Sequence, residues 1–457
     1  LALARELEGA GLEQISARLA GGEGRLQLTG LMGPARSLAQ AVLTARAEGP
    51  ILLIVSDERR VADAIFDLTA FLASWGIDRK VLNFPALEVD PYRGLSPHFN
   101  IVSARARALA ALVDEEPVVL VAPATALLYL TASPAVSAEG IVKLRRGVEF
   151  EPGELERKLL VAGYIHEDPV TSPGDFARRG GILDVHPPDH TEPLRLEFVG
   201  DELDEIRTFS PETQRATGSL EEVRIYPSRE WCFADSHREE LLERLRGKGV
   251  TSELIASVER GSFPPGINFA LPELSDFKCT FFDYMSQGIV LVEEPADVLR
   301  QVSAEWERVL DSYGEAPSGI ATPEPTEFLL SPEDFASRLT GRSVSFQEMD
   351  MLEATPSNEL TPNKKFHLSS QLLPVFRGNV KDFVEEIRRQ KGALRQVHIF
   401  VGHRGLAERL IEILQESHLS AGLTDDRPVE AGTVALHLGN LSHGFVLPEL
   451  GQAVFSG

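Results

Sequence analysis

The chain contains two kinds of apolar run, and the difference between them constrains the fold more than any other feature. Residues 51–56 (ILLIVS) and 287–292 (QGIVLV) are almost entirely apolar, which is typical of parallel strands covered on both faces. Residues 182–186, 194–199 and 206–209 instead alternate between apolar and polar side chains, with Gly, Pro and Asp between the runs. This second pattern is typical of half-buried antiparallel strands. We therefore expect a parallel α/β sheet and a separate, mainly antiparallel sheet.

The order of these patterns along the chain predicts its domains. With 457 residues, the chain is too long for one ordinary domain. Strand and helix patterns alternate at the start, stop at the antiparallel runs and resume after them. The predicted ranges are 1–131 and 223–353 for the two parts of one parallel-sheet domain, 132–222 for a domain inserted into it, and 354–457 for a third α/β domain of unknown role.

Composition excludes several classes of function. The formal net charge is −24, whereas a protein that binds duplex DNA usually has a basic surface. The two cysteines have no metal-ligand spacing and form no disulfide framework, so we expect no metal site and a reducing, cytoplasmic compartment. No apolar run approaches the roughly 18 residues of a membrane span. The chain begins at Leu1 rather than Met, and we interpret it as a portion of a longer protein.

A Gly-containing turn between a predicted strand and a predicted helix lies where a phosphate-binding loop would lie. Residues 30–37 read GLMGPARS. Gly30 and Ser37 fit the pattern G-x-x-x-x-G-K-[ST], but Ala35 replaces the second Gly and Arg36 replaces the Lys. Ala restricts the turn, and Arg is bulkier than Lys. We therefore expect an ordinary strand-to-helix turn that binds no nucleotide.

The antiparallel region contains motifs that resemble one protein family. These motifs are FARRGGILDVHPP (176–188), LRLEFVGDELDEIRTF (194–209) and SPETQR (210–215). Together they resemble the second domain of the transcription-repair coupling factors, the Mfd family. That domain is similar to a domain of the excision nuclease subunit UvrB, and in both families it binds UvrA.

The resemblance implies a fold and a function. The fold is α/β: a degenerate P-loop (RecA-like) parallel-sheet domain, interrupted by an inserted mainly antiparallel α+β domain and followed by a third α/β domain. The function is that of a non-catalytic N-terminal scaffold that recruits UvrA to lesions at stalled RNA polymerase in nucleotide excision repair. The family's ATP- and magnesium-dependent DNA translocase motor, its polymerase-binding module and a C-terminal domain that contacts the second domain all lie outside this segment. We expect a cytoplasmic bacterial monomer.

The resemblance also implies a second damaged nucleotide signature. UvrB-like ATPases have an Asp-Glu pair after the strand that corresponds to 287–292, and this pair holds magnesium and the attacking water. Here the pair is Glu293-Glu294. A Glu in the Asp position places the carboxylate about one methylene too far out for a tight magnesium site. We therefore expect no cofactor and no metal in this segment.

Carried over residue by residue, the UvrA contacts fall on Arg179 and Arg195, with Arg207 close by. The apolar contact falls on Val199, where related sequences commonly have Phe, so an aromatic anchor is missing. From spacing alone, the favoured interpretation is that these arginines are solvated partners of Glu197, Asp201 and Glu205.

One alternative from the enzyme class stays open, a UvrB-type ATPase that clamps DNA. The altered loop and acidic pair oppose it. So does the predicted helix at 101–112, which leaves no room for the long DNA-clamping hairpin of UvrB. His98, in the loop before this helix, is expected to have a structural or capping role.

Overall fold

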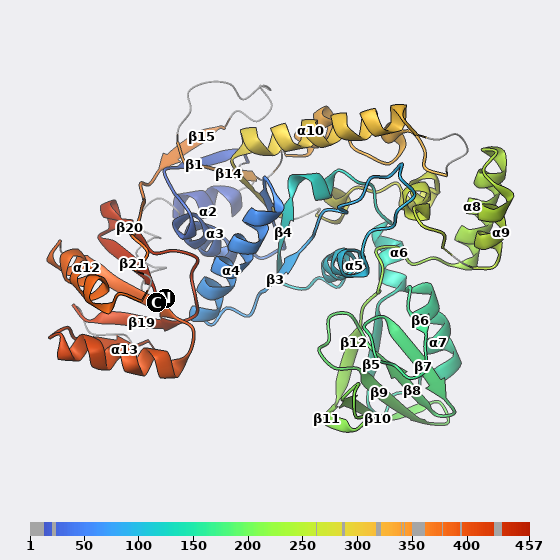
Figure 1. Ribbon diagram of the computed structural model, residues 1–457, viewed down its shortest axis with the longest axis horizontal. Coiled ribbons are helices and arrows are strands. Elements are labelled where there is room, and N and C mark those ends of the chain that lie inside the picture. Colours follow the sequence, from blue (N-terminus) through green and yellow to red (C-terminus); the bar gives the residue numbers. More distant parts are fainter. Residues whose placement is uncertain are drawn as a thin grey trace.

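The computed structural model describes most of the chain. The described residues are 13–20, 24–261, 263–285, 288–316, 321–339, 341, 343–349, 362–376, 378–393, 395–424 and 432–457. Within these ranges no helix is both long enough and apolar enough to cross a membrane. Figure 1 shows a central layered body, a green β-rich unit below it and an orange-red α/β unit beside it.

A seven-stranded, all-parallel sheet forms the central body, as the uninterrupted apolar runs predict. Its strand order is β15-β1-β14-β13-β2-β4-β3. The strands are β1 (Leu26–Thr29), β2 (Ile51–Val55), β3 (Lys80–Asn83), β4 (Val118–Pro123), β13 (Ile289–Glu293), β14 (Ser343–Gln347) and β15 (Lys364–His367). The chain thus leaves this sheet after β4 and returns to it at β13.

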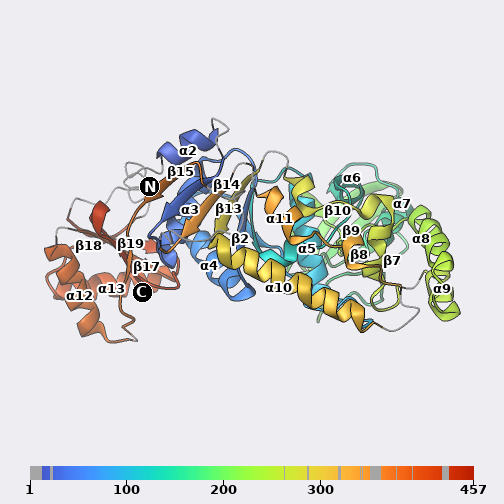
Figure 2. The ribbon, with the colours of Figure 1, turned by 90° about the horizontal axis from the view of Figure 1, so that it is seen from above.

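Helices cover both faces of the parallel sheet, which explains why β2 and β4 are buried along their whole length. One apolar cluster joins the sheet to α3 (Pro34–Arg46) and α4 (Glu58–Ser74). A second cluster joins it to α5 (Phe99–Val113) and α10 (Pro295–Gly314), the long yellow helix seen along the front of Figure 2. Shorter helices are α2 (Glu13–Ala20), α6 (Pro134–Glu139) and α11 (Pro332–Arg338). Residues 84–98 contain no strand, and α5 begins at Phe99.

The alternating runs form a six-stranded sheet of order β11-β10-β9-β8-β7-β6, in which only the β6–β7 pair is parallel. The strands are β6 (Ile165–His166), β7 (Asp175–Arg179), β8 (Ile182–Val185), β9 (Leu194–Val199), β10 (Glu202–Phe209) and β11 (Ala216–Leu220). A two-stranded antiparallel sheet of β5 (Val142–Arg145) and β12 (Glu222–Ile225) accompanies it, with α7 (Pro152–Val161). All three pack around one apolar core.

Two features differ from the predicted segmentation. The expected boundary at residue 222 falls at the start of β12, whose Val223 and Ile225 pack into the same core as β9. The segment that begins there therefore continues the antiparallel unit. Strand β15 lies in the range expected for the third domain. It nevertheless pairs with β1 and forms the edge of the parallel sheet.

The C-terminal unit is a mixed six-stranded sheet of order β16-β20-β21-β17-β19-β18. Its strands are β16 (Gln371–Leu372), β17 (Gln396–Val401), β18 (Ala421–Leu423), β19 (Val434–Leu438), β20 (Phe445–Leu447) and β21 (Gln452–Ser456). One face carries α12 (Val380–Gly392) and α13 (Arg404–Glu416). The other face packs on α3 and α4, where the rings of Phe71 and Phe400 lie 5.3 Å apart. Two further helices, α8 (Asp235–Gly247) and α9 (Ser252–Glu259), pack together at the far end of the molecule (Figure 1).

Candidate functional site

The strand register of the six-stranded sheet places all four predicted contact residues on one face. Arg195 is opposite Arg207 on β10 and opposite Asp184 on β8. Arg179 is opposite Ile182, which lies two residues before Asp184, and Val199 lies four residues after Arg195. Because side chains two residues apart on a strand point to the same face, Arg179 and Val199 lie on the face of Arg195. The intervening residues face the core. The register therefore brings these residues together on one surface.

Arg195 is held within its own sheet. Its Nε and Nη2 atoms donate to the two carboxylate oxygens of Asp184 at 2.7 and 2.8 Å. The guanidinium also lies 4.6 Å from the ring centre of Phe209. The exposed fractions of the two side chains are 21% for Arg195 and 7% for Asp184. The hydrogen bonds that Arg195 donates to Asp184 raise the pKa of Arg195, although burial opposes this shift. Most of its hydrogen-bonding capacity is thus already used.

Arg179 and Arg207 are more accessible. Arg179 is paired with Asp168, through an Nε–Oδ2 contact of 2.9 Å and a second contact from Nη2, and its side chain is 54% exposed. Arg207 is paired with Glu197 at 3.2 Å and with Glu205, and its side chain is 40% exposed. Surface ion pairs of this kind contribute little to stability. A partner carboxylate could therefore replace the internal acid at small cost.

An exposed apolar pair lies between these cations. Val199 is 71% exposed and Ile182, on the neighbouring strand, is 39% exposed. Large apolar side chains on the polar face of a half-buried sheet are uncommon, and such a pair is suited to contact with another protein. The sequence prediction did not include Ile182 among the contact residues. Ile182 lies two residues before Asp184 on the same strand, so the alternation places it on the polar face.

The turn that lies where a phosphate-binding loop would lie is surrounded by the chain's own charges. Arg36 is 2% exposed, and its Nη1 lies 3.0 Å from Oε2 of Glu293. Its Nη2 contacts Glu294 at 3.1 Å and Glu348 at 3.0 Å. Arg60 contacts the same Glu293 oxygen at 2.8 Å. The altered loop and the altered acidic pair, 257 positions apart in the sequence, therefore meet as a single ion cluster.

These charges also fix the ionisation of Glu293. Burial by itself would raise the pKa of this carboxyl, but Arg36 and Arg60 outweigh burial and hold the pKa below its usual range. Gln40 donates a further hydrogen bond at 2.9 Å. Glu293 is therefore a buried carboxylate with protein partners on both oxygens, and neither oxygen is directed at open space.

The polar groups of the loop itself are engaged by the segment after β15. Ser370 accepts a hydrogen bond from the backbone N–H of Met32 at 2.8 Å and donates to the carbonyl of Gly30 at 3.1 Å. Gly30 has a φ of +92°, and a Cβ there would lie 2.7 Å from the carbonyl oxygen of Leu368. The glycine is thus required by close packing of two backbones. Ser37 and Ala35 lie in the first turn of α3 and are buried.

Three of the histidines make contacts within the fold that account for their positions. His98 caps α5, since its Nδ1 accepts from the N–H of Asn100 at 3.2 Å, as the sequence predicts. His398 and His437 form a buried pair, with 3.0 Å between Nδ1 and Nε2. In the part of the chain that the structure describes, no three His, Cys, Asp or Glu residues are grouped to hold a metal ion.

Comparison with known families identifies the antiparallel unit first. Residues 142–231 match the UvrB interaction domain. This match covers the two-stranded sheet, α7 and the six-stranded sheet with its arginine-bearing face, and it continues past residue 222, as does the core of the unit.

Comparison with individual proteins then extends the similarity over nearly the whole chain, which resembles the N-terminal region of transcription-repair-coupling factors. The Myxococcus xanthus factor is 27% identical over 94% of this chain, and the Bacillus subtilis (strain 168) factor is 25% identical over 94%. The Escherichia coli (strain K12) factor is 28% identical over 59% of this chain. The chain spans 38% of the length of the first two relatives and 24% of the third.

Proposed function

We propose that residues 142–231 bind UvrA through the open face of their six-stranded sheet, in nucleotide excision repair coupled to transcription. The observation that carries this proposal is the coincidence of the UvrB interaction domain match with a sheet face that exposes Arg179, Arg207 and Val199. The family that the sequence resembles uses this domain to bind UvrA.

The chemistry of the face defines the expected partner surface. Arg179 and Arg207 suit bidentate pairing with carboxylates. Val199 and Ile182 supply a small apolar contact between them. We infer that UvrA presents acids around an apolar side chain. Arg195 supports the face by holding Asp184, and its exposed edge is available for a further contact.

We also propose that the rest of the chain is a non-catalytic scaffold, built on a degenerate P-loop domain that the UvrA-binding unit interrupts. The buried Arg36–Glu293 pair supports this, because these two charges neutralise each other and are both withdrawn from solvent. The translocase motor, the polymerase contact and the DNA contact would belong to other modules of a longer protein.

The binding proposal is tested by capture of purified UvrA on the full 457-residue chain. The double variant Arg179→Glu, Arg207→Glu is expected to weaken capture roughly ten-fold or more, because like charges would then face each other. The matched control is Arg157→Glu on α7, an arginine that is 71% exposed but lies on the opposite side of the core. Equal capture of UvrA by the wild type and the double variant would refute the proposal.

The scaffold proposal is tested by calorimetry with Mg-ATP. A UvrB-type DNA-clamping ATPase should bind it at micromolar concentration. We expect no heat of binding from this chain, because the loop amide of Met32 and the carboxylate of Glu293 already have partners. Saturable binding that is lost in Ser37→Ala would favour the ATPase.

A further inference from the structure

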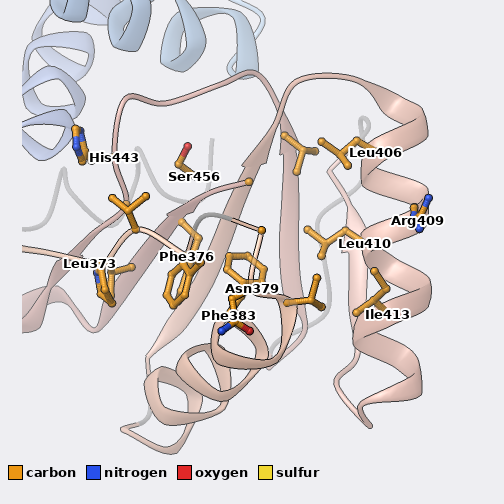
Figure 3. Close-up of a pocket in the computed structure, with 18 of the residues that line it drawn as sticks. Leu373, Phe376, Asn379, Phe383, Leu406, Arg409, Leu410, Ile413, His443 and Ser456 are labelled. Carbon is orange, nitrogen blue, oxygen red and sulfur yellow. The ribbon is translucent and has the colours of Figure 1, made fainter.

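The C-terminal unit contains an apolar groove that neither the family match nor the relatives explain. The groove has a cavity volume of about 500 Å³ and lies between α12, α13 and the ends of β17 and β21. Figure 3 shows Phe376 and Phe383 on one side of it and Leu410 and Ile413 on the other. Arg409 lies at its edge.

The topology of the sheet explains why the groove exists. A parallel pair of strands needs a long crossover connection, usually a helix, whereas an antiparallel pair needs only a short turn. Strands β20 and β21 are antiparallel and are joined by a short turn at Pro448–Leu450, and residues 439–444 join β19 to β20 without a helix. Among the residues that the structure describes here, two helices therefore cover a face of six strands, and they leave a space between α12 and α13.

Helix α13 carries apolar side chains that the core of this unit covers only in part, since Leu410 and Ile413 pack against that core and are half-buried. Ala407 and Leu414 are buried against the sheet. Leu406, Leu410 and Ile413 form a second stripe at helical spacing, which lines the groove. Leu406 is 39% exposed. A helix with two apolar stripes normally packs against two neighbours.

The opposite rim is also apolar and exposed. Val375 is 66% exposed and Val380, at the start of α12, is 47% exposed. Both line the groove together with Phe376 and Phe383. Contiguous exposed apolar surface rimmed by polar residues marks interaction sites in soluble proteins.

We propose that this groove docks an amphipathic α-helix of another protein, with acidic residues flanking its apolar face. The stripe from Leu406 to Ile413 spans about two helical turns, which matches a helix whose apolar residues recur at i, i+3 or i+4, and i+7. The acidic flank follows from Arg409, a charged residue of the lining that makes no ion pair within the part of the chain that the structure describes.

The test uses two labelled synthetic peptides of about 16 residues. Both have leucines at helical spacing; one has Glu and the other Lys beside the leucines. Fluorescence anisotropy with the full chain is expected to show roughly ten-fold tighter binding of the Glu peptide. The variant Arg409→Glu should reverse this preference, an effect that a general loss of folding cannot produce.

The groove itself is tested with Leu406→Glu, which should weaken both peptides about ten-fold or more. Its control is Leu310→Glu on α10, a leucine that is 41% exposed outside the groove. The proposal is overturned if neither peptide binds, or if Leu406→Glu leaves binding unchanged. Sedimentation that shows a dimer dissociated by Leu406→Glu would also overturn it, because the occupant would then be a second copy.

Discussion

Three arginines of one sheet face differ in their accessibility. The least exposed, Arg195, stabilises the sheet, whereas Arg179 and Arg207 are accessible to a partner protein. Arg195 is bound along one edge of its guanidinium by both oxygens of the nearly buried Asp184, whereas Arg179 and Arg207 pair with acids at the surface. Removing one partner of a buried pair leaves an uncompensated charge, which costs far more than loss of a surface pair.

Replacing Arg195 by Ala should therefore destabilise the antiparallel unit by about 3 kcal/mol, roughly a hundred-fold in the equilibrium constant for opening. Arg179→Ala should cost less than about 1 kcal/mol. Native-state hydrogen exchange of the β8 and β9 amides measures both effects. Adding Asp184→Ala to Arg195→Ala should restore part of the protection; equal protection in the two single variants would contradict this assignment.

Arg36 is a second residue whose loss should be costly. Arg36→Ala leaves Glu293 buried with only Arg60 and Gln40 as partners. We expect a loss of about 2–3 kcal/mol in the stability of the parallel-sheet body, measured by hydrogen exchange of β1 and β13. The pair Arg36→Met with Glu293→Leu should lose much less, since it removes both charges together.

The lowered pKa of Glu293 predicts a pH dependence with a definite sign. A carboxyl whose pKa is lowered by folding contributes stability above its ordinary pKa of 4.5, and this contribution disappears as the pH falls through the lowered value. The difference in stability between the wild type and Glu293→Gln should thus shrink on acidification below 4.5. Thermal unfolding over a pH series measures it, and a constant difference would argue against the ionised state.

At the scale of elements, the sequence predicted most strands and helices because their periodicity is strong. The runs at β2, β13 and β9 and the helix α4 all appear where the pattern places them. Strand β14 was missed, because SVSFQ alternates polar and apolar residues over only five positions and contains no long apolar run. The pairing of Asp184 with Arg195 could not be predicted either, since it depends on the register between β8 and β9.

One contact between elements predicts a pH effect of the opposite sign. Asp67 on α4 is 2% exposed and accepts hydrogen bonds from the N–H and hydroxyl of Ser442, at 2.7 and 2.9 Å. Burial raises the pKa of Asp67 to about 6. Protonated Asp67 therefore contributes to the stability of the folded chain. This contribution is complete below the ordinary pKa of 3.8 and is lost as the pH rises through about 6.

Asp67→Asn removes the buried charge and keeps an oxygen that accepts from the N–H of Ser442, and its amide NH2 can donate to the Ser442 hydroxyl in place of the bond that Asp67 accepts. Relative to this variant, the wild type should gain stability as the pH falls from 8 to 5. The free energy of unfolding, followed through the contact between α4 and the C-terminal unit, measures the change. If the difference in free energy of unfolding between the wild type and Asp67→Asn does not vary with pH, the pKa of Asp67 is not raised by burial.

At the scale of the whole molecule, a buried ion pair joins the central body to the end of the segment that matches the UvrB interaction domain. Arg105 on α5 is 1% exposed, and its Nε and Nη2 contact Glu230 at 2.6 and 2.8 Å. Arg105 also donates to the carbonyls of Pro85 and Ala126, both at 3.0 Å. This contact fixes the antiparallel unit to α5.

Arg105→Met should loosen this attachment by roughly 3–5 kcal/mol, because it leaves Glu230 buried and unpaired. Binding of UvrA should persist, since the arginine-bearing face lies on the other side of the antiparallel unit's core. Limited proteolysis near residue 230 is expected to increase. The double variant Arg105→Met, Glu230→Leu serves as the control and should resist proteolysis nearly as well as the wild type.

The small sheet of β5 and β12 has a consequence for evolutionary history. The two strands are the first and last of the antiparallel unit and lie side by side, so its ends are separated by one strand spacing, about 4.8 Å. A segment whose ends meet can be grafted into a surface loop of an unrelated host without stretching either partner. This geometry allows the unit to be transferred as one piece from one host domain to another without disturbing the core of either.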